Sequence, residues 1–204
     1  MFSLSVEKAI LNQIKKAPRG ELIMPSDFSH LGSSEAVRLA LFRLEKQAVL
    51  SRVAQGIYVR PKISKLIGPI LPSAEEVAEA IAKRDRIRTV PTGNYALNAL
   101  GLSTQVPMNI VLLTDGSPRE IRVGKRKIKF KKTTPKNLLA KGKISRLVIQ
   151  ALKEMGNGRV TENEQKKVVA LLKREEEANL VHDIGLAPVW IQLIMKKALG
   201  HGEN

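Results

Sequence analysis

The chain has no cysteine among its 204 residues, which excludes a disulfide framework and a thiolate metal site and favours a reducing compartment. Aromatic residues are also scarce, with one Trp, two Tyr and four Phe, too few for platforms that stack single-stranded bases. Long apolar runs are missing as well. Because Glu7 and Lys8 interrupt the first segment, we expect neither a signal peptide nor a membrane span, and a cytoplasmic location.

Acidic residues are outnumbered: 35 Lys and Arg stand against 19 Asp and Glu, for a net charge of +16. A charge of this size attracts polyanions such as nucleic acids. The charge is unevenly distributed. Residues 1–62 hold 10 basic and 5 acidic groups (net +5), whereas residues 93–160 hold 14 basic and 3 acidic groups (net +11). The sequence therefore predicts two basic surfaces, the stronger one in the second part of the chain.

Six short segments make up the first part of the chain. Ser5 is a helix cap before an apolar stripe, and Ser33 and Ser34 stand at the start of another helix. The turn at 54–56 contains a glycine, which favours a hairpin. The expected order is a helix, a short strand, two helices in close succession and two hairpin strands, at 6–16, 21–24, 25–31, 34–46, 49–53 and 57–60. This order is typical of a winged helix-turn-helix DNA-binding domain, which we assign to residues 1–62.

The third predicted helix has two different faces. Val37, Ala40 and Leu44 share an apolar face, so the opposite face is free to contact DNA. On that face Arg38 has the geometry for two hydrogen bonds to guanine, whereas Arg43 and Lys46 suit phosphate. The candidate DNA-binding residues of this helix and the hairpin are Ser34, Arg38, Arg43, Lys46, Arg52, Gln55 and Arg60. Winged domains also bind proteins, and that alternative stays open.

Residues 61–72 contain three prolines and predict an irregular hinge between two domains. Beyond it, strand patterns at 109–113, 119–123 and 126–132 predict an antiparallel meander, and a strongly amphipathic helix follows at 144–155. The expected fold class is therefore α+β: a winged helix-turn-helix, a small α/β domain with an antiparallel meander, and C-terminal helices. The corresponding domain boundaries are 1–62, 73–155 and 156–204.

The last of these strands carries a run of basic residues. Alternation sends Ile128 and Phe130 to one face of the sheet and the intervening lysines to the other. The candidate surface for a polyanionic partner comprises Lys125, Arg126, Lys127, Lys129, Lys131 and Lys132. An alternative is a solvated edge strand whose lysines prevent aggregation, and the sequence leaves both interpretations open.

Residues for catalysis are few. His30, His182 and His201 are far apart and lack the paired spacing of metal ligands. The pair Gly124-Lys125 lacks the upstream glycine and the following Ser or Thr of a phosphate-binding loop. We therefore expect no enzyme activity, no metal and no cofactor.

Several segments resemble a known family. The segments 41–44, 50–53 and 56–58 resemble the winged N-terminal domain of AbiEi-like antitoxins, from the type IV toxin-antitoxin systems of bacterial abortive infection. Segments between Pro91 and Asn137 resemble the second domain of one branch of that group. The resemblance implies a protein of phage defence that represses its own operon and counteracts a nucleotidyltransferase-like toxin. It implies no antitoxin role for individual residues.

Two other functions stay open: a free-standing winged-helix transcription factor, and an RNA-binding or nucleic-acid-processing protein. The expected partners are double-stranded DNA of the chain's own operator and the toxin, with no membrane partner. A palindromic operator would suit a dimer or two monomers equally well, so the sequence leaves the oligomeric state undecided.

Overall fold

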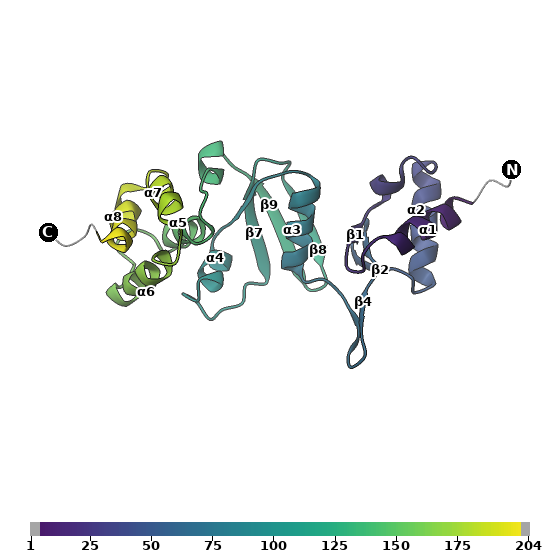
Figure 1. The fold of residues 1–204 in the computed structure, drawn as a ribbon, viewed down its shortest axis with the longest axis horizontal. Helices are drawn as coiled ribbons and strands as arrows, with labels where there is room; N and C mark the ends of the chain where they lie inside the picture. Colours follow the sequence, from purple (N-terminus) through teal and green to yellow (C-terminus); the bar gives the residue numbers. More distant parts are fainter. Residues whose placement is uncertain (1–4, 201–204) are drawn as a thin grey trace. The chain divides into compact units, whose positions relative to one another are not determined.

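The computed structural model describes residues 5–200 as a mixed α+β chain (Figure 1). It divides into two compact units, one of residues 1–81 with 121–125 and the other of residues 82–120 with 126–204. Within the described residues, every helix is too short or too polar to cross a bilayer.

The first unit contains the predicted elements of residues 6–60 in the predicted order. They are α1 (Val6–Lys16), β1 (Leu22–Ile23), η1 (Pro25–Phe28), α2 (Ser34–Lys46), β2 (Ser51–Ala54) and β3 (Ile57–Val59). One element differs in kind, because residues 25–28 form a short 3-10 helix. The strands make an antiparallel sheet of order β1-β3-β2.

Local signals determine where these helices begin. The Ser5 hydroxyl accepts a hydrogen bond from the Lys8 amide at 3.4 Å, and the Ser33 hydroxyl accepts one from the Ala36 amide at 3.2 Å. Ser33 is therefore the N-cap of α2, and Ser34 is its first helical residue. Both helices bury one face in a shared core made of Ile10, Ile14, Ile23, Phe28, Val37, Ala40, Leu41, Leu44, Leu50 and Tyr58.

The expected irregular hinge is wrong, because residues 62–70 form a hairpin of β4 (Lys62–Ser64) and β5 (Gly68–Ile70). Its prolines occupy places that a hairpin tolerates. Pro61 and Pro72 flank the strands, and Pro69 lies in a two-stranded sheet in which each strand is an edge. Gly68 has a φ of 77°, which a turn residue without a Cβ adopts freely.

The helix α3 (Ala74–Arg84) follows this hairpin and begins with a capping box. The Ser73 amide donates to the Glu76 carboxylate at 2.7 Å, and the Glu76 amide donates to the Ser73 hydroxyl at 3.1 Å. The apolar face of α3, including Val77 and Ile81, is buried.

The expected antiparallel meander is also wrong. The strands β6 (Thr89–Pro91), β7 (Asn109–Thr114), β8 (Arg119–Val123) and β9 (Arg126–Lys132) have the order β6-β7-β9-β8, and β7 runs parallel to β9. Burial explains this order. Ile128 and Phe130 of β9 are buried, so β9 takes an inner position beside β7, whereas β8 buries no residue and lies at the edge.

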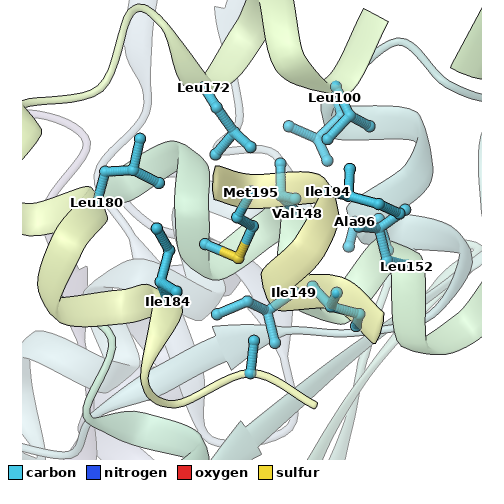
Figure 2. Packing of buried hydrophobic residues seen from close by; sticks show 14 residues of the cluster. Ala96, Leu100, Val148, Ile149, Leu152, Leu172, Leu180, Ile184, Ile194 and Met195 are labelled. Atoms are coloured by element: carbon cyan, nitrogen blue, oxygen red, sulfur yellow. The ribbon is translucent and has the colours of Figure 1, made fainter. Parts of the chain in front are cut away.

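Except for a short 3-10 helix at residues 135–138, which contacts β6 and β7, the remaining helices of the second unit pack around one core (Figure 2). They are α4 (Asn94–Ala99), η2 (Pro135–Leu138), α5 (Lys143–Met155), α6 (Glu162–Leu172), α7 (Glu177–Ile184), α8 (Val189–Lys196) and η3 (Lys197–Leu199). The structure differs here from the predicted boundary at residue 156. The apolar face of α5, with Val148 and Leu152, is covered by side chains of α6, α7 and α8, so these helices belong to the same unit as α5.

Candidate nucleic-acid interface

The outer face of α2 exposes a cation beside two apolar side chains. Arg38 is exposed and makes no hydrogen bond or ion pair within the described residues. Leu39 and Phe42 are each 48% exposed on the same side of the helix. An arginine can donate two hydrogen bonds to guanine, and apolar side chains contact the thymine methyl group. Leu39 and Phe42 were not among the predicted DNA-binding residues, although both lie outside the apolar stripe of Val37 and Ala40.

Two further candidates lie toward the end of α2. The Lys46 ammonium lies 5.4 Å from the centre of the Phe42 ring, a distance within the range of cation–π contacts. The Arg43 guanidinium lies 3.4 Å from a Glu7 carboxylate oxygen of α1, and its side chain is 57% exposed. Both cations are thus at the surface, where they suit phosphate contacts.

The β2–β3 hairpin ends in a two-residue turn, Gln55-Gly56, in which Gly56 has a φ of 68°. Gln55 is exposed at this turn. Arg52 is exposed on β2, and its Nε donates to the Ala54 carbonyl at 3.4 Å. These two side chains therefore stay candidates for contacts that fix the position of the protein along a duplex.

Arg60 has a structural partner instead. Its two terminal nitrogens donate to the carbonyls of Lys15 at 3.1 Å and Ala17 at 2.6 Å, at the C-terminal end of α1. Helix ends leave such carbonyls without intrahelical donors, and a cation there also suits the helix dipole. We assign Arg60 to the fold of the first unit rather than to the interface.

This assignment predicts a stability effect. Arg60→Ala should lower the free energy of unfolding by about 2 kcal/mol, because two α1 carbonyls lose charged donors. Urea denaturation followed by circular dichroism measures the change. Arg52→Ala is the matched control, with an expected change below about 0.5 kcal/mol. Equal stability of the Arg60 variant and wild type would contradict the structural role.

In the second unit, the predicted alternation of β9 is confirmed. Ile128 and Phe130 are 0% and 1% exposed, whereas Lys129 and Lys131 point to the other face and are exposed. Because β9 lies inside the sheet, its lysines do not protect an edge, and the edge-strand interpretation is wrong.

The six basic residues of this region have different environments. Lys127 pairs with Glu120 at 3.0 Å, and Arg126 donates to the Pro107 carbonyl at 3.2 Å. Lys125 is exposed in the β8–β9 turn. The exposed ammonium groups of Lys129, Lys131 and Lys132 have no hydrogen bond or ion pair in the part of the chain that the structure describes. The basic face of β9 thus consists mainly of Lys129 and Lys131, whereas Lys132, opposite the buried Thr114, lies at the end of the strand on the face of Ile128 and Phe130. We call these three residues the β9 lysines.

A cavity of about 420 Å³ lies beside them. Lys131 and Val111 of the sheet line it together with Tyr95, Asn109 and Glu154. The strand register places Val111 opposite Lys129 and Leu113 opposite Lys131. On this face of the sheet, apolar side chains of β7 therefore lie beside charged side chains of β9. Such a face suits an extended polyanion better than a small uncharged ligand.

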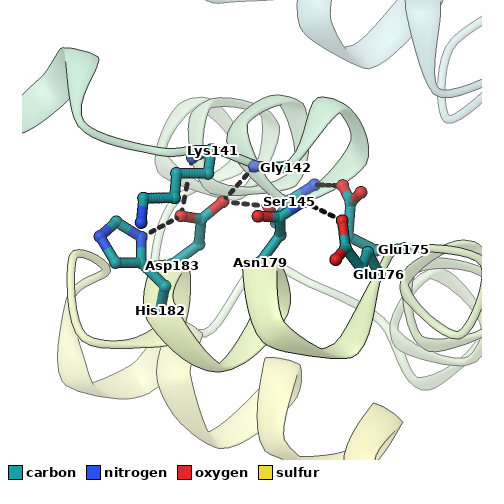
Figure 3. A network of polar contacts seen from close by, with 8 residues as sticks. All are labelled: Lys141, Gly142, Ser145, Glu175, Glu176, Asn179, His182 and Asp183. Carbon is teal, nitrogen blue, oxygen red and sulfur yellow. Dashed lines mark hydrogen bonds and ion pairs between the residues drawn. The ribbon is translucent and has the colours of Figure 1, made fainter.

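Asp183 lies in a buried polar network at the start of α5 (Figure 3). Its carboxylate accepts hydrogen bonds from the Lys141 amide at 2.9 Å, the Gly142 amide at 2.8 Å and the Ser145 hydroxyl, and it contacts His182 Nδ1 at 2.7 Å. A second carboxylate, that of Glu175, accepts from the amides of Ile144 at 2.6 Å and Ser145 at 3.1 Å. Two acidic side chains from the α6–α7 region thus cap the N-terminus of α5.

The hydrogen bonds of the Asp183 carboxylate indicate the role of this network. Burial raises the pKa of Asp183, but the hydrogen bonds from Ser145, His182 and the two amides outweigh it, so the net pKa is lowered. The carboxylate stands between Ser145 and His182, so the imidazole does not contact the hydroxyl as a general base would. We interpret the network as a helix cap.

The other histidines add no ligand set. His30 is exposed in the first unit, and His201 lies outside the described residues. Among residues 5–200, no three His, Asp or Glu side chains converge as metal ligands would.

The comparison with known families bears on most of the chain. A model described as a family of unknown function, DUF6088, matches residues 9–180, which include α2, both hairpins, the sheet and the β9 lysines. No curated protein matches the chain. The description of this family names no function and does not mention AbiEi-like antitoxins. The chain therefore belongs to the DUF6088 family, whose function is unknown.

Proposed function

We propose that the chain is a cytoplasmic DNA-binding transcriptional repressor, with residues 6–60 as a winged helix-turn-helix and α2 as its recognition helix. The observation that carries the proposal is the outer face of α2, where the unpaired Arg38 side chain lies beside the exposed Leu39 and Phe42. An exposed α-helix with one free arginine and apolar neighbours suits the major groove, where both guanine and thymine are recognised.

The proposed contacts divide by chemistry. Arg38 and Ser34, near the N-terminal end of α2, contact base edges, and Leu39 and Phe42 contact thymine methyl groups. Arg43 and Lys46 bind phosphates on one side of the groove. Arg52 and Gln55 of the hairpin bind the backbone next to it. Arg60 makes no part of this interface.

We further propose that the repressor acts on its own operon and is the antitoxin of a nucleotidyltransferase-like toxin, in phage defence. This proposal is supported by the resemblance of segments 41–58 and 91–137 to AbiEi-like antitoxins. The second unit, with most of the net charge, is the part that we expect to act on the toxin.

Repression is tested with a reporter gene placed behind the DNA that precedes the chain's own gene. Wild-type protein supplied in trans should lower reporter expression, and Arg38→Ala should restore most of it because a base contact is lost. Unchanged expression with wild-type protein at detectable levels would contradict autorepression.

The antitoxin role is tested separately, by co-expression with the neighbouring gene. A neighbour that encodes a nucleotidyltransferase and stops growth should be tolerated when this chain is present. Persistent growth arrest with soluble antitoxin in the cell would exclude the role, and a lone gene without such a neighbour would favour a free-standing transcription factor.

The β9 lysines favour a second candidate function, binding of nucleic acid by the second unit. Replacing Lys129, Lys131 and Lys132 together by Gln should lower the slope of log affinity against log salt by about 2 for a single strand and about 3 for a duplex, because three counterion-releasing contacts are lost. Fluorescence polarisation with single-stranded RNA and duplex DNA of equal length measures this slope. An unchanged salt slope with both the RNA and the duplex DNA would exclude nucleic-acid binding by the β9 lysines. Tighter binding of RNA than of DNA would favour an RNA-binding protein.

A further inference from the structure

The helix α5 carries a polar stripe opposite its apolar face. Arg146, Gln150 and Lys153 are four and three positions apart, so they lie on one side of the helix. Val148 lies on the other side, inside the core of the second unit. Lys136 of η2 adds a further cation, and these four polar side chains line one small hollow.

The hollow has a volume of about 10 Å³, which is about the space that one water molecule or one phosphate oxygen needs. Apolar side chains form part of its wall: Ala140, Ile149 and Leu186. Among the described residues, every ionisable side chain that lines it is a cation: Lys136, Arg146 and Lys153. The hollow therefore gathers three positive charges without an acidic side chain to balance them.

Two of the groups that line the hollow are buried without a hydrogen-bond partner. Gln150 is only 5% exposed, and its side-chain amide makes no hydrogen bond within the described residues. The Arg146 Nε is also buried, and it has no acceptor. A buried donor without an acceptor destabilises the fold, and a charged donor does so more strongly. The two groups therefore require an acceptor from outside the described chain.

The other two cations that line the hollow are exposed lysines. Lys153 Nζ donates to Asn137 Oδ1 at 3.2 Å, and the Asn137 amide donates to the Thr133 hydroxyl at 2.9 Å, so the Lys153 ammonium has a defined position. Lys136 makes no hydrogen bond or ion pair with any described residue. Partial burial and the positive charge of Lys136 both lower the pKa of Lys153. The two ammonium groups thus repel each other, and an anion bound between them removes this repulsion.

We propose that this hollow binds a dianionic phosphate group, either inorganic phosphate or the terminal phosphate of a nucleotide. One phosphate oxygen enters the hollow and accepts from Arg146 Nε and the Gln150 amide, and the other oxygens lie outside it, near Lys136 and Lys153. Arginine suits phosphate because its N–H groups donate side by side, and lysine adds a point charge. Three cations match a terminal phosphate, with about two negative charges, better than a phosphodiester, which has one.

Isothermal titration calorimetry of the full chain with inorganic phosphate, without DNA, tests the site independently of the proposed DNA binding. At about pH 7.5 and constant ionic strength, the wild type should bind one phosphate with a Kd of about 0.1 to 1 mM. Arg146→Gln should raise the Kd at least about tenfold, or about 1.4 kcal/mol. Lys136→Gln should raise it at least about threefold, and this variant should fold like the wild type because Lys136 is exposed and unpaired in the described chain.

The matched control is Lys143→Gln, which removes one exposed cation of α5 outside the hollow and should change the Kd less than about twofold. Nuclear magnetic resonance adds a readout at the site itself. The Arg146 Nε–H signal, identified by its loss in Arg146→Gln, should shift when phosphate is added. The Nε–H signal of Arg60, which is buried in the first unit, should not shift.

Two further titrations identify the source of the phosphate. Adenosine monophosphate that binds as tightly as inorganic phosphate would support a site for the phosphate group alone, and a Kd at least about tenfold lower would support a nucleotide. A dinucleotide with one phosphodiester and hydroxyl ends should bind at least about tenfold more weakly than inorganic phosphate.

Four results would overturn the phosphate site. They are a wild type without saturable binding of phosphate, variants of Lys136 and Arg146 that bind phosphate as well as the wild type, an Arg146 Nε–H signal that phosphate does not shift, and a dinucleotide that binds as tightly as phosphate. The first of these would show that water alone is the partner of Arg146 and Gln150.

Discussion

Replacing Asp183 by Ala should lower the free energy of unfolding by about 3 kcal/mol, a large share of the stability of a protein of this size. The carboxylate is 0% exposed and is the acceptor for the Ser145 hydroxyl and the amides of Lys141 and Gly142. Alanine leaves these buried donors without a partner. Urea denaturation followed by circular dichroism measures the loss. The matched control is Glu177→Gln, an exposed carboxylate on the same helix, with an expected change below about 0.5 kcal/mol.

The same residue predicts a pH dependence. The pKa of Asp183 is lower in the folded chain than its usual value of about 3.9, so the folded state holds the carboxylate ionised more firmly than the unfolded state does. Its contribution to stability is complete above that usual value and disappears as pH falls through the folded pKa. Asp183→Asn should therefore be less stable than wild type at pH 7 and should lose less stability on acidification below about pH 4.

Two outcomes would contradict the helix-cap interpretation of Asp183. One is an alanine variant as stable as wild type, which would mean that water replaces the carboxylate at no cost. The other is an acid limb of the stability curve that is equally steep in Asp183→Asn and wild type.

Arg38→Ala should weaken binding to the operator duplex about 5- to 150-fold, because one arginine that contacts guanine with two hydrogen bonds contributes about 1 to 3 kcal/mol of discrimination. Fluorescence polarisation with a labelled duplex from upstream of the gene measures the loss. Lys16→Ala is the matched control, since it removes one exposed charge of the same unit from α1 instead of α2. We expect that variant to bind within about threefold of wild type.

The affinity of Arg38→Ala for the operator and for a shuffled duplex distinguishes a base contact of Arg38 from a phosphate contact. A base contact predicts that Arg38→Ala binds the operator more weakly while its affinity for a shuffled duplex changes little. A phosphate contact predicts equal losses on both duplexes and a lower salt slope. Full affinity of the variant for the operator would remove Arg38 from the interface.

The sequence predicted the elements of residues 6–60 well because their signals are local. Ser5 and Ser33 cap the helices that follow them by accepting hydrogen bonds from amides only three residues further along the chain. Gly56 supplies the positive φ of a two-residue turn. The capping box of Ser73 and Glu76 is equally local. None of these features needs knowledge of a distant segment.

The strand order and the hinge were wrong because they depend on competition between segments. The position of β9 beside β7 follows from the burial of Ile128 and Phe130. The sequence of β9 shows that these two residues are apolar, but it does not show which strand lies next to them. In residues 61–72 the prolines indicated a break, whereas the Ser64 turn and Gly68 favoured a hairpin, and the hairpin formed.

The candidate site shows the same limit. The alternation of exposed lysines on β9 could be predicted from a period of two. The hydrogen-bond acceptors of Arg60 lie more than 40 residues away. The partner of Arg126, and the partners of Asp183 other than its neighbour His182, also lie outside their own strand or helix, so local patterns did not predict these contacts. Leu39 and Phe42 were visible as apolar residues outside the buried stripe of α2, a signal that predicts contact with a partner.

The most direct test of the proposed repressor is the specificity of wild-type protein for its own upstream DNA. A labelled duplex from that region is titrated against a shuffled duplex of the same length and composition, at physiological salt. If the outer face of α2 reads DNA sequence, the upstream duplex should bind at least about 10³-fold more tightly. Equal affinity for the two duplexes, with the whole of it lost at high salt, would show that the basic charge alone binds DNA and would contradict sequence recognition by α2.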